Sequence, residues 1–462
     1  MSEQAFCIHG HFYQPPREDP QTGTIPVEAG AAPFSNWNER IMDDCYRPNA
    51  EAGNFGNISF NIGPTLSEWM EQNHPSVIQR TVTDDRYNIK KYSAGNAMAQ
   101  SFHHTILPLA TRQDKFTQIR WGITHFIHRY GRQPAGMWLP ETAVDMETLE
   151  VLFLLGIRFT ILAPWQAISE IDSRQPYLVD LGQNRSMTVF FYDRELSSGI
   201  SFDQRITSNA DDFVNRYLSP RYSSGGGDQL ILVATDGELY GHHQEFRYEF
   251  LKRLYANSLT IAGIHPVYPE LWLKENPPKE FVAIQNNTSW SCMHDLLRWS
   301  GSCSCTPNPD WKAPLRQALN RVAEIIDQVF LDETRHLTKD PWTLRDLALQ
   351  ARDPHFDLLQ TTGGLVEPVL NADKSKKATL LLRSQFERQR MFASCAWFFE
   401  DFDRIEPQNA VRYAANAIHL AQKATGTKLA GDLAIIFEKV RSNRTNLNAS
   451  KVFEEFLERV SL

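Results

Sequence analysis

Apolar positions along the chain follow two patterns, and the change between them falls near residue 305. Over the first part, short apolar runs rich in β-branched and aromatic residues alternate with segments of helical length. Runs this short favour strands, and strands alternating with helices predict a parallel sheet with right-handed crossovers. The predicted strands are 6–11, 58–62, 136–139, 159–162, 187–192, 230–234 and 281–284, and the predicted helices are 65–71, 115–130, 146–155 and 244–256. This pattern indicates an α/β fold with an irregular (β/α)7 barrel.

After Trp311 the pattern becomes helical only. Apolar residues recur at spacings of three and four, which predicts a single buried stripe on one helix face. The stripe consists of Leu315, Leu319, Val322, Ile326 and Val329. Further helices are predicted at 379–403, 407–423, 429–440 and 451–460. We therefore predict a barrel domain over residues 1–305, followed by an α-helical domain over residues 306–462.

Composition and charge exclude several classes of protein. The chain has 462 residues, of which 42% are hydrophobic and 22% charged, as in ordinary globular proteins. A net charge of -8 provides no basic surface for nucleic acid. No apolar run reaches the ~18 residues that a membrane-spanning helix needs, and the first residues do not resemble a signal peptide. We expect a cytoplasmic protein with no nucleic-acid or membrane partner; its oligomeric state is not predicted.

The cysteines and tryptophans give different signals. Only Cys303 and Cys305 of the six cysteines form a tight pair, and one residue separates them. Zinc-binding pairs are usually separated by about two to four residues, so we expect reduced, buried thiols and no metal or other cofactor. Eleven tryptophans, however, are more than a core of this size needs.

The first candidate site residues follow the first predicted strand. In parallel α/β barrels, residues at the carboxyl ends of the strands face the active site. His9 and His11 stand at i and i+2, so both point to one side of the strand, and Gln14 follows them. These histidines are expected to bind substrate hydroxyls or a metal, unless they are ordinary core residues.

Two carboxylates follow other predicted strands. Glu141 comes directly after strand 136–139 and three residues after Trp138, where a buried charge is costly without a role or partner. The alternative is an acidic residue in the first turn of a helix. Asp236 ends the strongly apolar strand 230–234. Its Asp-Gly sequence is also common in turns. However, three further titratable residues, Glu238, Tyr240 and His242, follow it closely, which favours a functional site.

Aromatic and basic residues gather after the last predicted strand. This segment contains Trp290, His294, Arg298 and Trp299. Flat aromatic faces stack on sugar rings and the basic groups bond hydroxyls, although a tryptophan-rich domain seam would have similar composition. Two carboxylates at strand ends among such residues suit glycoside hydrolysis, in which one attacks the anomeric carbon and the other transfers protons. The acid must then have a raised pKa.

These segments, in this order, resemble the motifs of glycoside hydrolase family 57, whose members are retaining enzymes that act on α-glucans. His9-Gly-His11 with Gln14-Pro15 is similar to the family's first region, with two residues inserted. Trp138-Leu-Pro-Glu141 resembles the region that carries the nucleophile, which puts that role on Glu141. Asp236-Gly-Glu238 resembles the region that carries the acid/base, which puts that role on Asp236. The family fold is a seven-stranded (β/α) barrel with a C-terminal helical bundle.

The resemblance also implies a substrate site and a choice of reactions. The bundle is expected to pack on the barrel and complete the active site, with Trp397 as a contributor, and His104 is expected near the scissile bond. Hydrolysis, 4-α-glucanotransfer and branching of α-1,4-glucans all occur in the family. The implied substrate-binding residues are His9, His11, Gln14, His104, Trp138, Glu238, Tyr240, His242, Trp290, His294, Arg298, Trp299 and Trp397.

Two other functions compete with this interpretation. A metal-dependent polysaccharide deacetylase or mannosidase-like enzyme on a similar barrel would bind its ion through His9, His11, Asp236, His242 and His243. The adjacent pair His242 and His243 points in opposite directions, which disfavours it. A carbohydrate-binding protein without activity is the other alternative, although nothing but catalysis needs both carboxylates.

Overall fold

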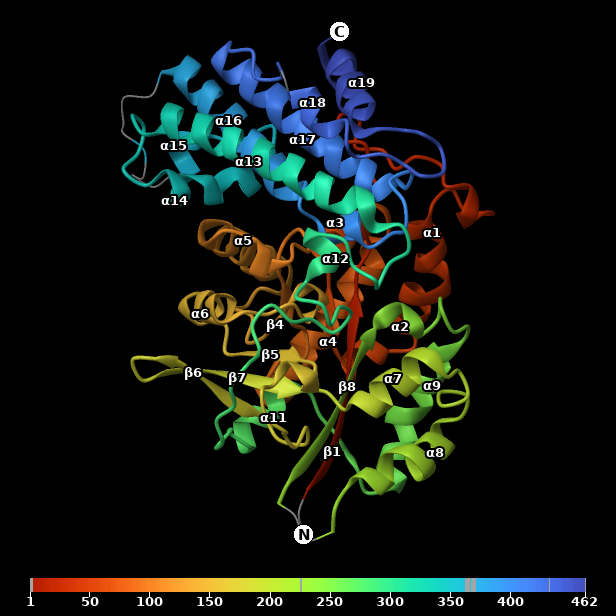
Figure 1. Ribbon diagram of the computed structural model, residues 1–462. Coiled ribbons are helices and arrows are strands. Elements are labelled where there is room, and N and C mark those ends of the chain that lie inside the picture. The colour runs from red at the N-terminus through yellow and green to blue at the C-terminus, as the bar shows by residue number, and fades with distance from the viewer. Residues whose placement is uncertain (1–2, 225–226, 362–365, 367–370, 432, 462) are drawn as a thin grey trace. The chain divides into compact units, whose positions relative to one another are not determined.

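The computed structural model describes residues 3–224, 227–361, 366, 371–431 and 433–461 (Figure 1). The chain folds into two compact units. The barrel unit comprises Met1–Gln14, Val27–Phe102 and Gly122–Ser291, and the helical unit comprises Pro15–Pro26, His103–Trp121 and Cys292–Leu462. The helical unit thus takes in two earlier segments and starts at Cys292, before the point near residue 305 where the apolar pattern changes.

The centre of the barrel unit is strand β1 (Gln4–Phe12), whose neighbours are both parallel to it. It pairs with β2 (Ser59–Ile62) on one side and with β8 (Gln229–Asp236) on the other. All but the first residue of β1 are buried, because side chains on both faces of the strand lie in the protein interior. The short strand β9 (His265–Pro266) pairs with the beginning of β1.

The remaining strands form two further ladders. Strand β3 (Ala99–Gln100) pairs in parallel with β4 (Met137–Trp138). Strand β5 (Phe159–Leu162) pairs in parallel with β7 (Arg185–Phe191), and β6 (Tyr177–Gly182) forms an antiparallel hairpin with β7. Strands this short lie close together in the barrel but share few hydrogen bonds.

Single contacts join the ladders into a barrel. The parallel bridge between Phe60 and Ala97 links β2 to β3, and that between Gly136 and Phe159 links β4 to β5. After β7, the amide of Asp193 donates to the Leu232 carbonyl of β8 at 2.6 Å. The parallel strands therefore follow the order β8-β1-β2-β3-β4-β5-β7, which confirms the predicted irregular (β/α)7 barrel.

Helices of the barrel unit follow the strands in sequence. They include α3 (Pro64–Asn73), α4 (Pro75–Tyr92), α6 (Met146–Leu154), α7 (Arg194–Phe202), α9 (Arg247–Arg253) and the last part of α5 (Arg112–Tyr130). Aspartate side chains cap two of them: Asp145 accepts from the Thr148 amide at the start of α6, and Asp193 caps α7. Predicted strand 281–284 makes only isolated bridges, and predicted helix 244–256 begins later, at Arg247.

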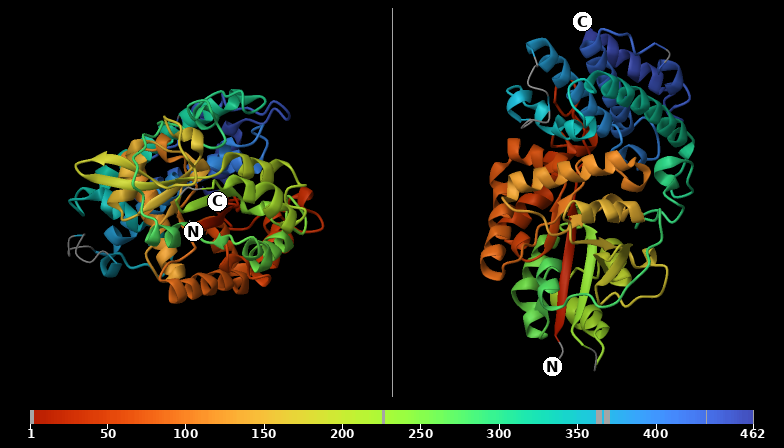
Figure 2. Two further views of the ribbon diagram at one scale, coloured as in Figure 1. Left: turned by 90° about the horizontal axis from the view of Figure 1, so that it is seen from below. Right: turned by 90° about the vertical axis from the view of Figure 1, so that its left-hand side faces the viewer.

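In the helical unit, three long helices pack on one another: α13 (Lys312–Thr334), α16 (Ala372–Arg390) and α17 (Ile405–Thr425) (Figures 1 and 2). The predicted stripe on α13 is confirmed, since all its residues are buried except Val329, which is half-buried. Shorter helices are α12 (Leu297–Ser300), α14 (Pro341–Arg345), α18 (Leu433–Phe437) and α19 (Ala449–Ser461). Among the described residues, no helix is long and apolar enough to cross a membrane.

A buried ion network holds the segment His103–Trp121 within the helical unit. Asp114 pairs with Arg345 and with Arg388, each at 2.8 Å, and Arg388 also reaches Asp327 at 2.6 Å. Although burial opposes it, the charges of Arg388 and Arg345 lower the pKa of Asp114 to about 2. Removing one member would leave buried charges uncompensated.

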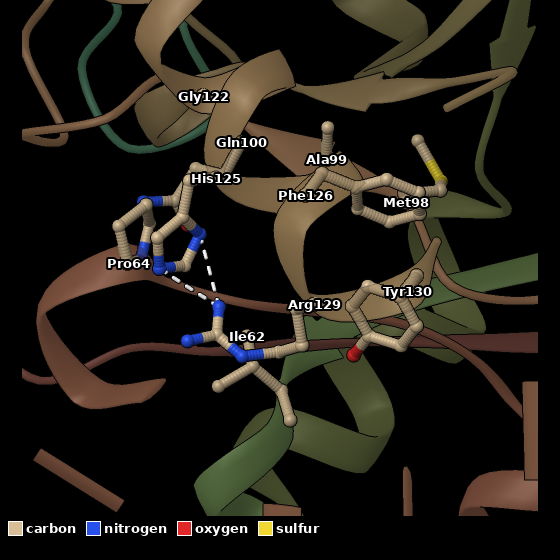
Figure 3. A pocket seen from close by; sticks show the side chains of 10 residues that line it. All are labelled: Ile62, Pro64, Met98, Ala99, Gln100, Gly122, His125, Phe126, Arg129 and Tyr130. Carbon is tan, nitrogen blue, oxygen red and sulfur yellow. Dashed lines mark hydrogen bonds between the residues drawn. The ribbon is translucent and has the colours of Figure 1, made fainter. Parts of the chain in front are cut away.

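One small cavity lies in the barrel unit between β2, β3 and α5 (Figure 3). His125 and Arg129 line it, with Arg129 Nη1 2.8 Å from His125 Nε2. The cavity has a volume of about 10 Å³, which is room for roughly one water molecule. It is too small to hold a sugar.

Gly122 on α5 makes the close contact beside this cavity possible. A Cβ at residue 122 would lie 2.0 Å from the Gln100 carbonyl oxygen of β3. Glycine inside a helix normally costs about 0.5–1 kcal/mol relative to alanine. Here we expect the opposite: Gly122→Ala should lower the free energy of unfolding by roughly 1–3 kcal/mol, because the helix must move away from the strand. Urea denaturation measures this change.

Thr124→Ala is the matched control, because Thr124 is exposed on the same helix. Its free energy of unfolding should stay the same or rise slightly. A Gly122→Ala variant as stable as the wild type would show that the contact between α5 and β3 is not tight.

Candidate active site

Two histidines and a tryptophan form the base of the site at the carboxyl ends of the strands. The His9 and His11 rings both stack on the indole of Trp138, with centroids 4.8 and 5.1 Å away. Both histidines also contact the amide of Asn61 on β2, and His9 Nδ1 lies 2.9 Å from Ser59 Oγ. The prediction that His9 and His11 point to the same side of their strand is therefore confirmed.

Burial determines the charge state of these histidines. It lowers the pKa of His9 to about 3 and that of His11 to about 4, although the hydrogen bonds to Asn61 favour the charged form. Both imidazoles are therefore neutral near pH 7. A neutral ring can donate a hydrogen bond from one nitrogen and accept one at the other, as recognition of a hydroxyl requires.

Glu141 lies in a strained turn just after β4. Its backbone and that of Thr142 adopt positive φ values of 57° and 50°, a region that non-glycine residues enter at a cost of about 1–3 kcal/mol each. Glu141 Oε2 accepts hydrogen bonds from Trp290 Nε1 at 3.0 Å and from Ser291 Oγ at 2.6 Å. The amide of Trp290 also donates to the Glu141 carbonyl at 3.0 Å. Three hydrogen bonds thus fix this residue.

Gln166 stabilises the turn from behind. Its side chain is completely buried, and its oxygen accepts from Thr142 Oγ1 at 2.9 Å and from the Ala163 amide at 2.8 Å. Its nitrogen donates to the carbonyls of Thr142 and Thr288 at 2.9 and 3.1 Å. One amide thereby ties together the loops after β4 and β5 and the segment that leads to Trp290.

Asp236 is the second carboxylate and ends β8 directly beside His11 of β1. The residue is exposed to solvent at the end of its strand, although protein atoms around the carboxyl group reduce its hydration. This burial, together with the negative charge of Glu141, raises the pKa of Asp236 from 3.8 to about 7. The two carboxylates therefore sense each other's charge, and Asp236 keeps its proton close to neutral pH.

A third acidic residue, Glu238, is buried next to this pair. It accepts a hydrogen bond from the Tyr46 hydroxyl at 2.6 Å and one from the Tyr13 amide at 3.1 Å. Burial and the charge of Asp236 raise its pKa to about 8, against the hydrogen bond from Tyr46. Gln14 donates to the same Tyr46 hydroxyl at 3.0 Å, so Gln14 and Glu238 belong to one network.

The other predicted residues of the barrel unit are Tyr240, His242 and Trp290. Tyr240 is buried, and its hydroxyl accepts from Thr235 Oγ1 at 3.3 Å. His242 Nδ1 lies 3.0 Å from Asp44 Oδ2. Trp290 is half-buried and packs edge-on against Trp138 at 5.1 Å.

Five predicted residues belong to the helical unit. His104 is buried at a positive φ of 56°, with Nδ1 2.5 Å from Ser394 Oγ. His294 contacts cysteines, and the Arg298 guanidinium lies over the Phe398 ring at 5.2 Å. Trp299 and Trp397 are fully buried, as Trp138 is, which corrects the expectation that these tryptophans present open faces to a sugar. Of the four tryptophans expected to contact a sugar, only Trp290 is partly exposed.

Sequence reasoning missed the residues that position the site. Ser59 and Asn61 have a signal in the sequence, since two polar residues at i and i+2 near the end of an apolar strand point to one face. Tyr46, Gln166 and Ser291 have no comparable signal. Their roles depend on long-range contacts that the sequence does not reveal.

The fold and site define a class: a (β/α)7-barrel protein with two carboxylates at the carboxyl ends of β4 and β8, an arrangement suited to glycoside chemistry. The model of Glycosyl hydrolase family 57 matches residues 27–285, more than half of the chain, and the chain belongs to this family. A second family model, a domain of unknown function (DUF3536), matches residues 308–461.

Individual relatives agree with this assignment. Alpha-amylase 1 of Dictyoglomus thermophilum is 25% identical over 225 residues, which cover 45% of this chain and 30% of that protein. An alpha-amylase of Pyrococcus horikoshii is 25% identical over 258 residues, which cover 53% of this chain and 38% of that protein. The match thus spans about a third of the length of these curated relatives. The exo-type maltose-forming amylase of Pyrococcus sp. ST04 shares the fold, with a TM-score of 0.74 and 15% identity over 98% of this chain and 88% of that one.

The raised pKa of Asp236 predicts a pH-dependent effect on stability. Between pH 4 and 7 the folded protein keeps a proton that the unfolded chain has lost, so its free energy of unfolding falls as pH rises. The amide of Asn does not titrate, so the free energy of unfolding of Asp236→Asn should not fall for this reason as pH rises. The variant should gain stability relative to the wild type from about pH 4 to about pH 7, and the difference should then stay constant. Urea denaturation across this pH range measures it.

Asp180→Asn controls for the removal of one negative charge, because Asp180 is an exposed aspartate of β6. Its curve should run parallel to that of the wild type. Parallel curves for Asp236→Asn as well would contradict the raised pKa.

Proposed function

We propose that the protein is a retaining glycoside hydrolase or transglycosidase that acts on α-1,4-glucans, with Glu141 as nucleophile and Asp236 as acid/base. The observation that carries this proposal is the charge interaction between them. Asp236 holds a proton to about pH 7, partly because Glu141 is negative, so the pair has one acid and one nucleophile at neutral pH.

The first step is glycosyl transfer to the enzyme. Both donors to Glu141 bind Oε2, so Oε1 is the oxygen that attacks the anomeric carbon. Asp236 gives its proton to the glycosidic oxygen, the bond between that oxygen and the anomeric carbon breaks, and an ester forms at Glu141. The leaving chain departs with a new hydroxyl group.

The second step depends on the loss of the same charge interaction. Once Glu141 is esterified, its negative charge is gone, and the electrostatic contribution that raised the pKa of Asp236 disappears with it. Asp236 is then a better base and accepts a proton from the incoming hydroxyl, which attacks the anomeric carbon and releases Glu141. Water as acceptor gives hydrolysis, and a glucan hydroxyl gives transfer or branching.

Several neighbours are suited to hold the sugar. The neutral imidazoles of His9 and His11 and the half-exposed Trp290 are suited to hydroxyl binding and stacking at the scissile bond. We also propose that the helical domain, residues 306–462, packs on the barrel and completes the site. In that arrangement, His104, which Ser394 orients, would contribute from the helical unit.

The geometry disfavours the metal-dependent alternative. A deacetylase-like site needs a histidine nitrogen aimed at the ion, yet His9 Nδ1 and Nε2 are both within hydrogen-bonding distance of Ser59 and Asn61. His242 Nδ1 is within hydrogen-bonding distance of Asp44. The remaining alternative, a binding protein without activity, is decided by the turnover measurements below.

Substitution of either carboxylate tests the proposal directly. Glu141→Gln and Asp236→Asn should each lower kcat on maltooligosaccharides by about a thousandfold or more, because each removes a group that acts in the transition state. Glu249→Gln, an exposed carboxylate of α9, is the control and should keep full turnover. Near-normal turnover in either site variant would refute the assignment.

Product analysis on amylose then distinguishes the reactions: glucose and maltose indicate hydrolysis, longer chains indicate transfer, and new α-1,6 linkages indicate branching. A wild type that releases no sugar and transfers none, yet binds glucan, would support the binding protein instead.

Gln166 should act as a positioning residue in this reaction. Gln166→Leu removes the five side-chain hydrogen bonds that tie the turn at Glu141 to its neighbours. We expect kcat to fall by roughly 10–100-fold with little change in KM, since misplacement of the nucleophile by about 1 Å has effects of this size.

The exposed Gln133, substituted by Leu, controls for loss of an amide from the barrel unit. An increase in KM at constant kcat would instead place Gln166 in substrate binding, and equal kinetics would show that the turn holds its shape without it.

A further inference from the structure

A cluster of four potential metal ligands lies in the helical unit, within the segment that joins the last barrel strands to α13. Cys292, His294, Cys303 and Cys305 each present one ligand atom, and all four atoms lie within 4.8 Å of one another. We propose that these residues bind one Zn²⁺ ion in a closed, structural site.

The distances between the ligand atoms fit a tetrahedron. Cys292 Sγ is 3.7 Å from Cys303 Sγ and 4.0 Å from Cys305 Sγ. His294 Nδ1 is 3.4 Å from Cys303 Sγ and 3.2 Å from Cys305 Sγ. At ordinary zinc bond lengths, tetrahedral ligands stand about 3.8 Å apart for two sulfurs and about 3.5 Å for sulfur and nitrogen. Only small movements would close the four atoms around an ion.

The ligand set favours zinc. Three thiolates and an imidazole are a common structural zinc set, and tetrahedral sulfur and nitrogen ligands select zinc among the abundant divalent ions. Protein groups fill all four positions, so no position is left for water or substrate. The ion would therefore stabilise the fold and take no part in the proposed double displacement.

Positive charge next to the cluster is what such a centre requires. Three thiolates and Zn²⁺ together carry a net charge of -1. Lys312 is fully buried nearby, and its Nζ donates to neutral oxygens, Thr306 Oγ1 at 3.0 Å and the Trp397 carbonyl at 2.5 Å. Within the described part of the chain, no carboxylate forms an ion pair with Lys312. Arg298 interacts with the Cys305 thiol. A buried cation without a carboxylate partner is compensated when the adjacent centre is anionic.

The backbone of the segment is shaped around the ligands. The amide of Cys305 donates to Cys303 Sγ at 3.4 Å, a hydrogen bond that stabilises negative charge on the sulfur. Directly after His294, Asp295 and Leu296 adopt positive φ values of 49° and 61°. Leucine rarely enters this region, so contacts on both sides must hold the turn in place. An ion between the two ligand pairs would do so.

A disulfide explains the cluster less well. A disulfide bond requires a sulfur separation of about 2.05 Å, and the Cys292–Cys303 pair stands at 3.7 Å. It would also leave Cys305 and His294 without a role. The single residue between Cys303 and Cys305 argues against a zinc pair in the sequence. In the structure, however, the pairs 292/294 and 303/305, each of which encloses a single residue, meet across α12.

The test is the metal content of the full-length protein purified under reducing conditions with zinc in the growth medium. We expect about one zinc per chain after dialysis. Cys303→Ser and His294→Ala should each lower the bound zinc at least tenfold. Cys395→Ser, a buried cysteine of the same unit outside the cluster, should keep it. Co²⁺ in place of zinc should give the thiolate charge-transfer absorption and intense visible bands of a tetrahedral sulfur site.

Three outcomes would overturn the proposal. One is a wild type that folds but binds neither Zn²⁺ nor Co²⁺, and another is a Cys292–Cys303 disulfide in freshly purified protein. The third is zinc that remains in Cys303→Ser but is lost in His11→Ala, because the metal would then lie in the barrel. If Cys303→Ser does not fold, chelation of the wild type decides: a lower melting temperature with restored stability on adding Zn²⁺ supports the site, and no change refutes it.

Discussion

One electrostatic interaction, that between the carboxylates of Glu141 and Asp236, underlies the proposed chemistry. They come from separate strands of one barrel, and burial together with the charge of the first raises the pKa of the second to about 7. Burial and this interaction thereby give two chemically similar groups different protonation states at neutral pH. Because esterification of Glu141 removes that charge, the same interaction lets Asp236 act first as an acid and then as a base.

The residues around Glu141 hold its carboxylate in the position from which it interacts with Asp236. The residue lies on strained backbone, and such strain persists only where neighbouring contacts determine the geometry. Trp290 and Ser291 bind its carboxylate, and the buried Gln166 fixes the turn beside it. At two seams of the barrel only isolated bridges join neighbouring strands, between Phe60 and Ala97 and between Gly136 and Phe159.

The sequence predicted features that depend on local pattern. Strand β1 and the stripe on α13 were recognisable because their apolar residues form a continuous run or a helical repeat. Helix α4 and the two-residue strand β3 were not predicted, since the first is mostly polar and the second is too short for any period. Both carboxylates follow apolar strands and were found. The role of the Gln166 amide and the proximity of Cys292 to Cys303 were not predicted, because both depend on how segments pack in three dimensions.

The most direct test is to trap the glycosyl-enzyme intermediate. Asp236→Asn lacks the base for the second step, but an α-maltosyl fluoride carries a leaving group that needs no proton, so the first step still proceeds. With Glu141 as nucleophile, mass spectrometry of this variant should find one added maltosyl unit, and peptide mapping should place it on Glu141. A glycosyl group on another residue, or wild-type turnover of the fluoride by this variant with no adduct, would contradict this assignment.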